Sequence, residues 1–356
     1  METISFAGDG LAPELVPAEE LADCAATALG EDGKRILSYG TGAGYTPLRE
    51  LVAERFGVHP SRVLLTNGWL QGFSFLIEGR VSAQSVIVEY PTYDRALQLL
   101  FRQSANLVYM DIREEGPGID LLEAHIRTLA KPAFAYLVPT FHNPTGQCLT
   151  EDERNRIGLL LFRRDALIVE DDSYGLLRYA GEPIRTMFDL SEKSIVYSSS
   201  FSYTVAPGLR VGAFILTEEL AAELAAKANA TYITPTLLGQ ATVFEFMRRG
   251  SFESNLVRLT GELLERRDAA LAALEGRFDG CTWSRPEGGI FLALALPDGM
   301  MASDLLARAS GVTADSGGEL GGFPNIVRIN FAGPAKDEVG EGISRLAAAY
   351  AAVRPD

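Results

Sequence analysis

Between Val63 and Leu216, short runs of apolar and β-branched residues alternate with segments that have the hydrophobic period of an α-helix. This alternation is typical of parallel strands joined by crossover helices, so it constrains the fold more than any other feature. The expected strands are Ser85 to Tyr90, Asn106 to Ile112, Phe134 to Pro139, Ala166 to Glu170, Ser194 to Ser198 and Val211 to Leu216. The expected helices are Arg95 to Gln103, Leu121 to Ala130 and Glu151 to Arg164, the last with Thr150 as N-cap and Glu153 as its capping-box partner. We predict an α/β domain with a doubly wound, mostly parallel sheet.

After Leu216 the pattern changes to helices rich in Ala, Leu, Glu and Arg, at Glu218 to Ala230 and Ser254 to Glu275. A strand region interrupted by Gly and Pro follows, and a helix from Asp337 to Val353 comes after it, which predicts a smaller α+β domain. The stretch from Gly317 to Pro324 is a loop that either covers a site or simply connects two elements. The predicted divisions are an N-terminal segment (1–35) that packs on the small domain, a large domain (36–225) and a small C-terminal domain (226–356).

The composition is that of an ordinary globular protein: 356 residues, 47% hydrophobic and 22% charged. The net charge of -15 disfavours contact with nucleic-acid phosphates or anionic membranes, because both need a basic face. Three widely spaced cysteines, Cys24, Cys148 and Cys281, predict neither a disulfide framework nor a zinc site, which fits a reducing cytoplasm. The first residues lack a signal-peptide pattern and no run reaches the roughly 20 apolar residues of a membrane helix, so we expect a soluble, unexported protein.

Three segments at the ends of expected strands carry residues suited to a small ligand. Thr66 to Gly72 opens a helix, where glycine allows close backbone approach and free amides favour a phosphate. Tyr93 follows the next strand and offers a ring that could stack on a planar ligand, and Asn143 presents its amide on a rigid Pro-Thr-Gly turn. Each segment alone also fits a structural role, as a turn before a helix, a packed tyrosine or a turn stabilised by its own amide.

A fourth segment, Val169 to Tyr174, is an apolar strand that runs into acidic residues. A carboxylate at this strand end, such as Asp171, can hold a proton on a pyridine nitrogen and make the ring an electron sink. Metal binding is the rival use of paired acids, but the three histidines show no ligand spacing around them: His59, His125 and His142. We therefore expect no metal site.

The fifth segment, Ser198 to Gly212, offers hydroxyl and guanidinium partners for a phosphate in Ser200, Ser202 and Arg210. Because the carboxyl ends of parallel strands meet at one edge of a sheet, we expect all five segments to converge there.

In this order, the five segments resemble those of the fold-type I pyridoxal-phosphate enzymes, specifically the class I/II aminotransferases of the 2-aminoadipate and MocR-like branch. The resemblance covers nearly the whole chain, including Ile4 to Gly8, Tyr39-Gly40, Pro47 to Glu50, Arg285 to Phe291 and Val327 to Phe331. It implies an aspartate-aminotransferase-like fold, pyridoxal 5′-phosphate or pyridoxamine 5′-phosphate as cofactor, and an amino acid or amine as substrate.

The resemblance also implies a role for each candidate residue. The phosphate would be held by the backbone of Gly68, Trp69 and Leu70 and by the side chains of Ser200, Ser202 and Arg210. Around the ring, Tyr93 would cover one face, Asn143 and Tyr174 would contact the phenolic oxygen, and Asp171 would hold the pyridine nitrogen.

Two residues have implied roles outside the cofactor's immediate surroundings. Arg328 would hold the α-carboxylate of an amino acid by a two-point fork. Tyr39 would reach the phosphate in the partner subunit, which implies a homodimer with shared active sites.

Three departures from the family pattern stand out. Trp69 and Leu70 replace a small polar residue and a glutamine, which reshapes the phosphate cup or narrows the pocket. The segment Ala314 to Gly317 matches the family's Pro-Gly segment near the substrate mouth only loosely. Tyr203 occupies the position of the Schiff-base lysine, and the remaining lysines lie outside the cofactor motifs: Lys34, Lys131, Lys193, Lys227 and Lys336. We interpret the tyrosine as natural, because alanine is the usual replacement when such a lysine is removed by design.

The family's lysine holds the cofactor covalently and shuttles a proton, and a phenol cannot do the first. The reference pKa of a tyrosine phenol, about 10, leaves little phenolate at neutral pH. A nearby cationic ring or arginine could lower that pKa enough for a base role. Loss of the shuttle costs about 10²- to 10⁴-fold in rate. We therefore expect non-covalently held cofactor, Tyr203 and Asp171 as catalytic residues, impaired ordinary transamination and lysine-independent chemistry.

Two other functions remain open. A catalytically silent binding protein or dimer partner would retain the pocket, and turnover of any amine substrate would argue against it. Because the family-like sequence starts at Ile4, we do not expect the DNA-binding role of MocR-type regulators. A protein that uses the pocket for an unrelated phosphate or carboxylate ligand would not need the ring-nitrogen partner Asp171.

Overall fold

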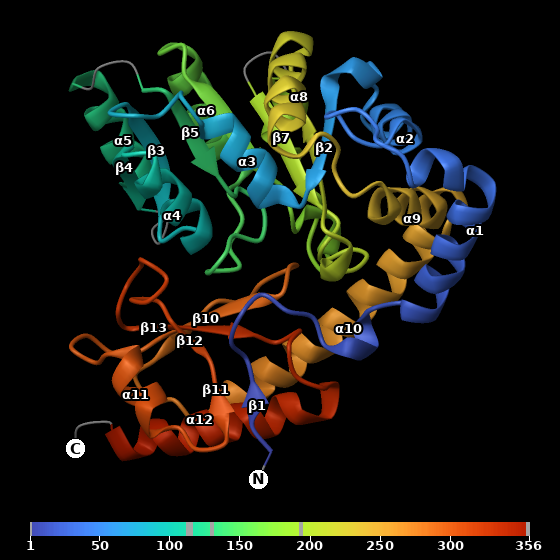
Figure 1. The fold of residues 1–356 in the computed structure, drawn as a ribbon. Coiled ribbons are helices and arrows are strands. Elements are labelled where there is room, and N and C mark those ends of the chain that lie inside the picture. The colour runs from blue at the N-terminus through green and yellow to red at the C-terminus, as the bar shows by residue number, and fades with distance from the viewer. Residues whose placement is uncertain (1, 112–116, 129–131, 192–194, 354–356) are drawn as a thin grey trace.

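The computed structural model describes residues 2–111, 117–128, 132–191 and 195–353. Figure 1 shows a large sheet with its helices above a smaller sheet, and the first residues of the chain lie beside the smaller sheet. The helices are α1 (Ala18–Ile36), α2 (Thr46–Phe56), α3 (Trp69–Ile77), α4 (Asp94–Arg102), α5 (Pro117–Thr128), α6 (Glu151–Phe162), α7 (Met187–Leu190), α8 (Glu218–Tyr232), α9 (Leu237–Arg248), α10 (Ser251–Leu274), α11 (Ala302–Arg308) and α12 (Val339–Val353). The strands are β1 (Ile4–Ser5), β2 (Val63–Asn67), β3 (Ser85–Tyr90), β4 (Asn106–Asp111), β5 (Phe134–Leu137), β6 (Leu167–Asp171), β7 (Ile195–Ser200), β8 (Val211–Ile215), β9 (Thr282–Trp283), β10 (Phe291–Ala295), β11 (Val312–Thr313), β12 (Asp315–Ser316) and β13 (Ile326–Asn330).

The large sheet has seven strands in the order β2-β8-β7-β6-β5-β3-β4. Strands β3 to β7 pair in parallel, as the alternating pattern predicts. Val86 and Val88 of β3 pack on the side of α3, whereas Ile87 between them packs on the side of α5 and α6. Both faces of the sheet are therefore covered, and the predicted doubly wound fold is confirmed.

Strand β8 departs from the expected pattern of parallel strands and crossover helices. It is antiparallel to β7 and to β2. The chain between β7 and β8 holds only turns and a short 3₁₀ helix (Pro207–Leu209), which is too little to carry the chain back for a parallel pairing. The sheet is mostly parallel, with its one reversed strand next to the Ser200 to Arg210 segment.

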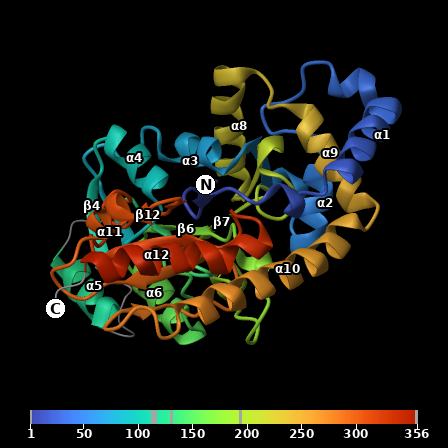
Figure 2. The same cartoon turned by 90° about the horizontal axis from the view of Figure 1, so that it is seen from below.

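The smaller sheet is antiparallel, in the order β12-β13-β10-β9. It packs on α10 and α12, which run side by side across the lower face in Figure 2. Strand β1 pairs with β11, so the start of the chain is joined to the C-terminal part. The Gly317 to Pro324 loop packs on the end of β3, where Phe323 contacts Tyr90 at 4.4 Å between ring centroids. The domain boundaries themselves stay a prediction.

The predicted element limits agree with the structure to within a few residues, and the capping box of Thr150 and Glu153 is present. The expected ends at Ile112, Ala130 and Ser194 lie outside the described residues. Helix α9 was not expected, because nearly all of its residues from Leu237 to Phe246 are buried and leave no polar stripe to reveal a helical period. None of the helices in the described ranges combines the length and apolarity that crossing a bilayer requires.

Strand β6 ends in a run of buried acidic side chains. Glu170 accepts hydrogen bonds from the backbone amides of Met187 and Phe188, both at 2.8 Å, and burial raises its pKa to about 8. Asp172 accepts from the Tyr197 hydroxyl at 2.8 Å, and burial raises its pKa to about 6. Both carboxyl groups are therefore harder to ionise in the folded protein than in the unfolded chain.

This arrangement predicts that the cofactor-free protein loses stability as the pH rises. Raised folded-state pKa values favour folding below the unfolded values of about 4. That contribution is lost progressively from there up to about pH 6 for Asp172 and about pH 8 for Glu170. Urea unfolding at a series of pH values should show this decline, and Asp172→Asn should make it shallower by up to about 1.4 kcal/mol per pH unit. The exposed control Asp152→Asn should leave the slope unchanged, and a stability that rises from pH 5 to 9 would contradict the prediction.

Candidate active site

A cavity of ≈ 280 Å³ lies at the carboxyl ends of the parallel strands, where the sequence predicts a site. Apart from Asp9 near the start of the chain, its lining residues lie between 69 and 210: Trp69, Leu70, Tyr93, Arg95, Tyr136, Val138, Asn143, Asp171, Ser173, Tyr174, Ser200, Ser202, Tyr203, Pro207 and Arg210. The structure thus brings together most of the candidate residues. Three candidates do not line the cavity: Gly68, Arg328 and Tyr39. Gly68 adjoins the cavity through its contact with Arg210, and Arg328 lies behind the lining residue Asn143.

One end of the cavity is suited to a phosphate. Gly68 precedes α3 with φ +82°, and a Cβ there would lie 2.2 Å from Nη2 of Arg210. The glycine therefore leaves room for the guanidinium beside the first turn of α3, where backbone amides have no helical partner. Ser200 and Ser202 line the same cavity with hydroxyl groups. Amides, hydroxyls and a guanidinium together are the donor set of a phosphate site.

Trp69 fills space between α3 and the sheet. Its indole Nε1 donates to Ser198 Oγ at 2.8 Å, and Ser198 Oγ donates in turn to the Glu170 carbonyl at 2.9 Å. The Trp69 ring stacks on Phe73 with centroids 4.7 Å apart. Trp69 therefore anchors this end of the cavity to β6 and β7.

Asp171 lies at the end of β6 and is almost fully buried. Its Oδ2 accepts from the Tyr136 hydroxyl at 3.0 Å, and its Oδ1 accepts from the amide and hydroxyl of Ser173. Burial raises the pKa of Asp171 to about 7, although these hydrogen bonds act in the opposite direction. A carboxyl group held rigidly, and balanced between its two protonation states near neutral pH, is suited to a pyridine nitrogen.

Tyr203 lies in the connection between β7 and β8, buried against Tyr174, with ring centroids 4.7 Å apart at 30°. Burial raises the pKa of Tyr203, and the effect of Arg328 in lowering it is smaller. In the protein without cofactor, burial therefore outweighs the arginine. At neutral pH Tyr203 is a protonated phenol that can donate a proton or a hydrogen bond.

Arg328 on β13 is held by three side chains. Its Nη1 donates to Asp9 Oδ1 at 2.8 Å and to Asn143 Oδ1 at 2.9 Å, and its Nη2 donates to Asp315 Oδ2 at 2.6 Å. Asn143 Nδ2 lies 3.4 Å from the Tyr174 hydroxyl, so Asn143 links Arg328 to the ring side of the cavity. The role of Arg328 toward a substrate carboxylate stays a prediction.

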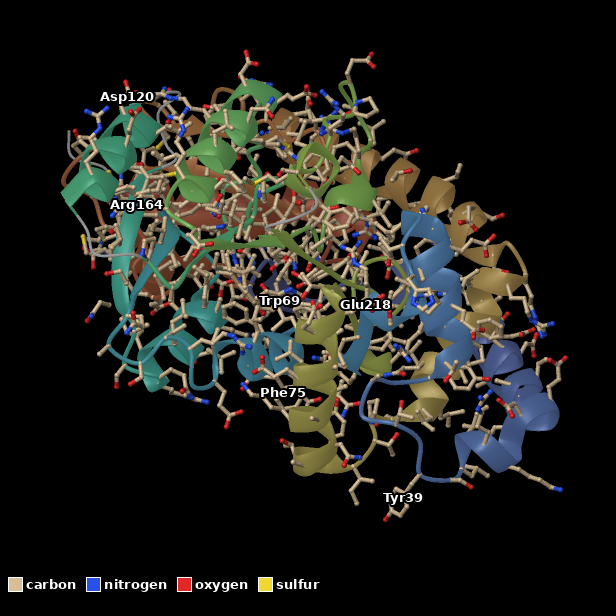
Figure 3. All side chains as sticks on the ribbon, turned by 90° about the horizontal axis from the view of Figure 1, so that it is seen from above. Tyr39, Trp69, Phe75, Asp120, Arg164 and Glu218 are labelled. Atoms are coloured by element: carbon tan, nitrogen blue, oxygen red, sulfur yellow. The ribbon has the colours of Figure 1, made fainter. Side chains whose placement is uncertain are left out.

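Tyr39 lies away from this cavity. Figure 3 shows it projecting from the edge of the molecule, whereas Trp69 lies in the interior, and 79% of Tyr39 is exposed. Its assignment to a partner's site stays a prediction.

No lysine among the described residues lines the cavity. Lys34 lies in α1, Lys227 donates to the carbonyls of Phe75 and Glu78, and Lys336 pairs with glutamates of α10. Lys131 and Lys193 lie outside the described residues. Within the described ranges, no group of His, Cys, Asp and Glu is arranged to hold a metal ion.

The sequence interpretation missed six lining residues, two of them apolar (Val138 and Pro207) and four polar: Asp9, Arg95, Tyr136 and Ser173. Ser173 directly follows Asp172 in the Asp171 segment, and Arg95 directly follows Asp94 in the Tyr93 segment. Their position beside predicted site residues could have indicated them. Asp9 lies between two glycines just after the family-like start of the chain, which was a usable signal. Tyr136 lies inside a buried strand and has no sequence signal of its own.

The chain matches known proteins over nearly its full length. The family aminotransferase class I and II matches residues 13–346. A 2-aminoadipate transaminase of Thermus thermophilus is 36% identical over 96% of this chain and 89% of its own. Among solved structures, the α-aminoadipate aminotransferase LysN of T. thermophilus, complexed with N-(5′-phosphopyridoxyl)-L-leucine, superposes with a TM-score of 0.92 at 33% identity, over 98% of this chain and 92% of that one. The kynurenine aminotransferase of Pyrococcus horikoshii, in complex with pyridoxamine phosphate, gives 0.94 at 30% identity, over 100% and 92%. This chain belongs to the class I and II aminotransferase family.

Proposed function

We propose that the protein binds pyridoxal phosphate or pyridoxamine phosphate without a covalent bond and acts on its adduct with an amino acid or amine by lysine-independent chemistry. One observation carries the proposal: the cavity combines a donor set suited to a phosphate, the Asp171 carboxyl and Tyr203. The sequence resemblance assigns the position of Tyr203 to the family's lysine. The named ligands of the two solved relatives, a phosphopyridoxyl amino acid and pyridoxamine phosphate, support it.

Different residues around the cavity hold different parts of the cofactor. The amides at the start of α3, with Ser200, Ser202 and Arg210, hold the phosphate. Tyr93 covers one face of the ring, while Asn143 and Tyr174 hydrogen-bond its phenolic oxygen. Asp171 keeps the ring nitrogen protonated, and the bound group then supplies an electron sink next to the substrate amine.

Tyr203 acts as a proton donor on the reacting side of this pocket. Its raised pKa keeps the proton on the phenol, and its stacking on Tyr174 fixes its orientation. A phenol cannot hold the cofactor covalently, and removal of an efficient base costs about 10²- to 10⁴-fold. Ordinary transamination is therefore impaired in this proposal.

The proposal includes a homodimer in which Tyr39 reaches the phosphate site of the partner. Tyr39 and its neighbour Leu37 are both more than three-quarters exposed, although both are amphipathic or apolar. The three cysteines are free thiols, which supports the cytoplasmic location expected from the sequence.

Absorption spectroscopy tests non-covalent cofactor binding. Wild-type protein titrated with pyridoxal phosphate should give a bound-cofactor spectrum, and one amine or amino acid of a panel should shift it. Borohydride treatment should leave no covalent label on wild type, whereas Tyr203→Lys should be labelled at residue 203 by mass spectrometry. Tyr203→Phe is the matched control and should stay unlabelled.

The outcomes separate the open functions. A wild type that binds the cofactor but responds to no amine would favour the silent binding protein. Absence of binding to either cofactor form, in wild type and in Tyr203→Lys, would contradict the proposal and favour an unrelated ligand.

Asp171→Asn tests the ring-nitrogen contact. The neutral side-chain amide of asparagine cannot balance the positive charge of a protonated ring nitrogen. Affinity for pyridoxal phosphate should therefore fall at least about tenfold. Asp172→Asn changes the adjacent, equally buried carboxyl, which does not line the cavity, and should leave the affinity within about twofold. Equal losses in both variants, measured by equilibrium titration, would show that the effect of Asp171 is structural.

A further inference from the structure

The guanidinium of Arg328 has almost no hydrogen-bonding capacity left. Nε and Nη2 both donate to Asp315 Oδ2, at 3.2 and 2.6 Å, and Nη1 donates to Asp9 Oδ1 and Asn143 Oδ1. Four of its five N–H groups are thus used, and a two-point fork on a carboxylate needs two that are adjacent and free. Arg328 also packs over the Phe291 ring, 4.5 Å from the centroid, and is buried.

The two aspartates are held in place by the backbone around them. Asn330 Nδ2 donates to the carbonyls of Gly8 and Gly10 at 3.1 and 2.8 Å, which fixes the chain on both sides of Asp9. The Gly8 amide donates to Asp315 Oδ2 at 2.8 Å. Residue 315 lies on β12, opposite Arg328 in the antiparallel register. The start of the chain therefore covers Arg328 and is held there by hydrogen bonds to β12 and β13.

The cavity wall presents a carboxylate rather than this guanidinium. Asp9 lines the cavity, whereas neither Arg328 nor Asp315 does. Two carboxylates around one guanidinium leave a net negative charge. Arg95 also lines the cavity, with Nε 3.9 Å from Asp9 Oδ2, but its side chain is exposed to solvent and faces Asp94 as well as Asp9. Asp9 also raises the pKa of Tyr203 by more than Arg328 lowers it.

We propose, on the basis of the proposed function, that the pocket selects an amine that has no α-carboxylate. Asp9 and Asp315 occupy the donors that would bind such a group, and Asp9 repels a second carboxylate at the cavity wall. The same oxygen atoms of Asp9 accept a hydrogen bond from a donor group of the amine. Asp9 and Asp315 are thus specificity-determining residues.

A matched pair of stable adducts tests this inference without turnover. N-(5′-phosphopyridoxyl)-L-leucine and N-(5′-phosphopyridoxyl)-3-methylbutylamine differ only in the α-carboxylate. Calorimetric titration of the full chain, freed of cofactor, should give at least about tenfold tighter binding of the 3-methylbutylamine adduct. The double variant Asp9→Ala/Asp315→Ala frees the fork of Arg328 and should reverse this preference. The control Asp298→Ala/Asp304→Ala removes two exposed carboxylates of the small part and should keep the wild-type ratio.

The outcomes distinguish this inference from the proposed function. If wild type binds the leucine adduct as tightly as the 3-methylbutylamine adduct, the inference is wrong while the cofactor pocket stands. If neither adduct nor pyridoxamine phosphate binds, the proposed function is wrong and the inference falls with it. Even if the Asp9→Ala/Asp315→Ala variant fails to fold, the ratio of the wild-type affinities for the two adducts tests the inference.

Discussion

The register between β6 and β7 is the constraint on which the site depends. It places Asp171 opposite Ser198, and Ser198 bridges the Trp69 indole to the Glu170 carbonyl. One hydroxyl group therefore ties Trp69, in the first turn of α3, to the strand that ends in Asp171. A slip of one residue would turn Asp171 to the opposite face of the sheet and break both bonds of Ser198.

Burial at this sheet edge also sets the chemistry of the acidic and phenolic groups. The same loss of hydration that brings the pKa of Asp171 near neutrality raises that of Tyr203 further above it. The two groups are thereby driven toward different tasks, one able to take up a ring proton and the other a donor. A tyrosine in such surroundings is an acid rather than a weak base.

Local patterns in the sequence predicted much of this fold. Alternating apolar runs located the strands from β3 to β8, and side chains just beyond strand ends, such as Asn143 and Asp171, lie in the cavity because parallel strands share an edge. The reversed direction of β8 could not be found in this way, since a strand's pattern carries no direction. Helix α9 was hidden because burial on all sides removes the period.

The surroundings of Arg328 were beyond local reasoning for a different reason. Its partners Asp9, Asn143 and Asp315 come from the start, middle and end of the chain, and only the folded molecule brings them together. Tyr203 was conspicuous because it departs from the pattern that the sequence resembles, whereas the position of Asp9 between two glycines gave no hint of Arg328 as its partner. A residue that neutralises a charge far away in the sequence shows no local pattern that would reveal this role.

The contact between Gly68 and Arg210 has an evolutionary consequence. A side chain at residue 68 would meet the guanidinium, the flexible end of Arg210, so this end would have to shift, and the backbone at φ +82° itself disfavours any residue but glycine. Loss of Arg210 would relieve only the contact and not the backbone strain, so residue 68 is expected to stay a glycine whether or not the arginine is kept.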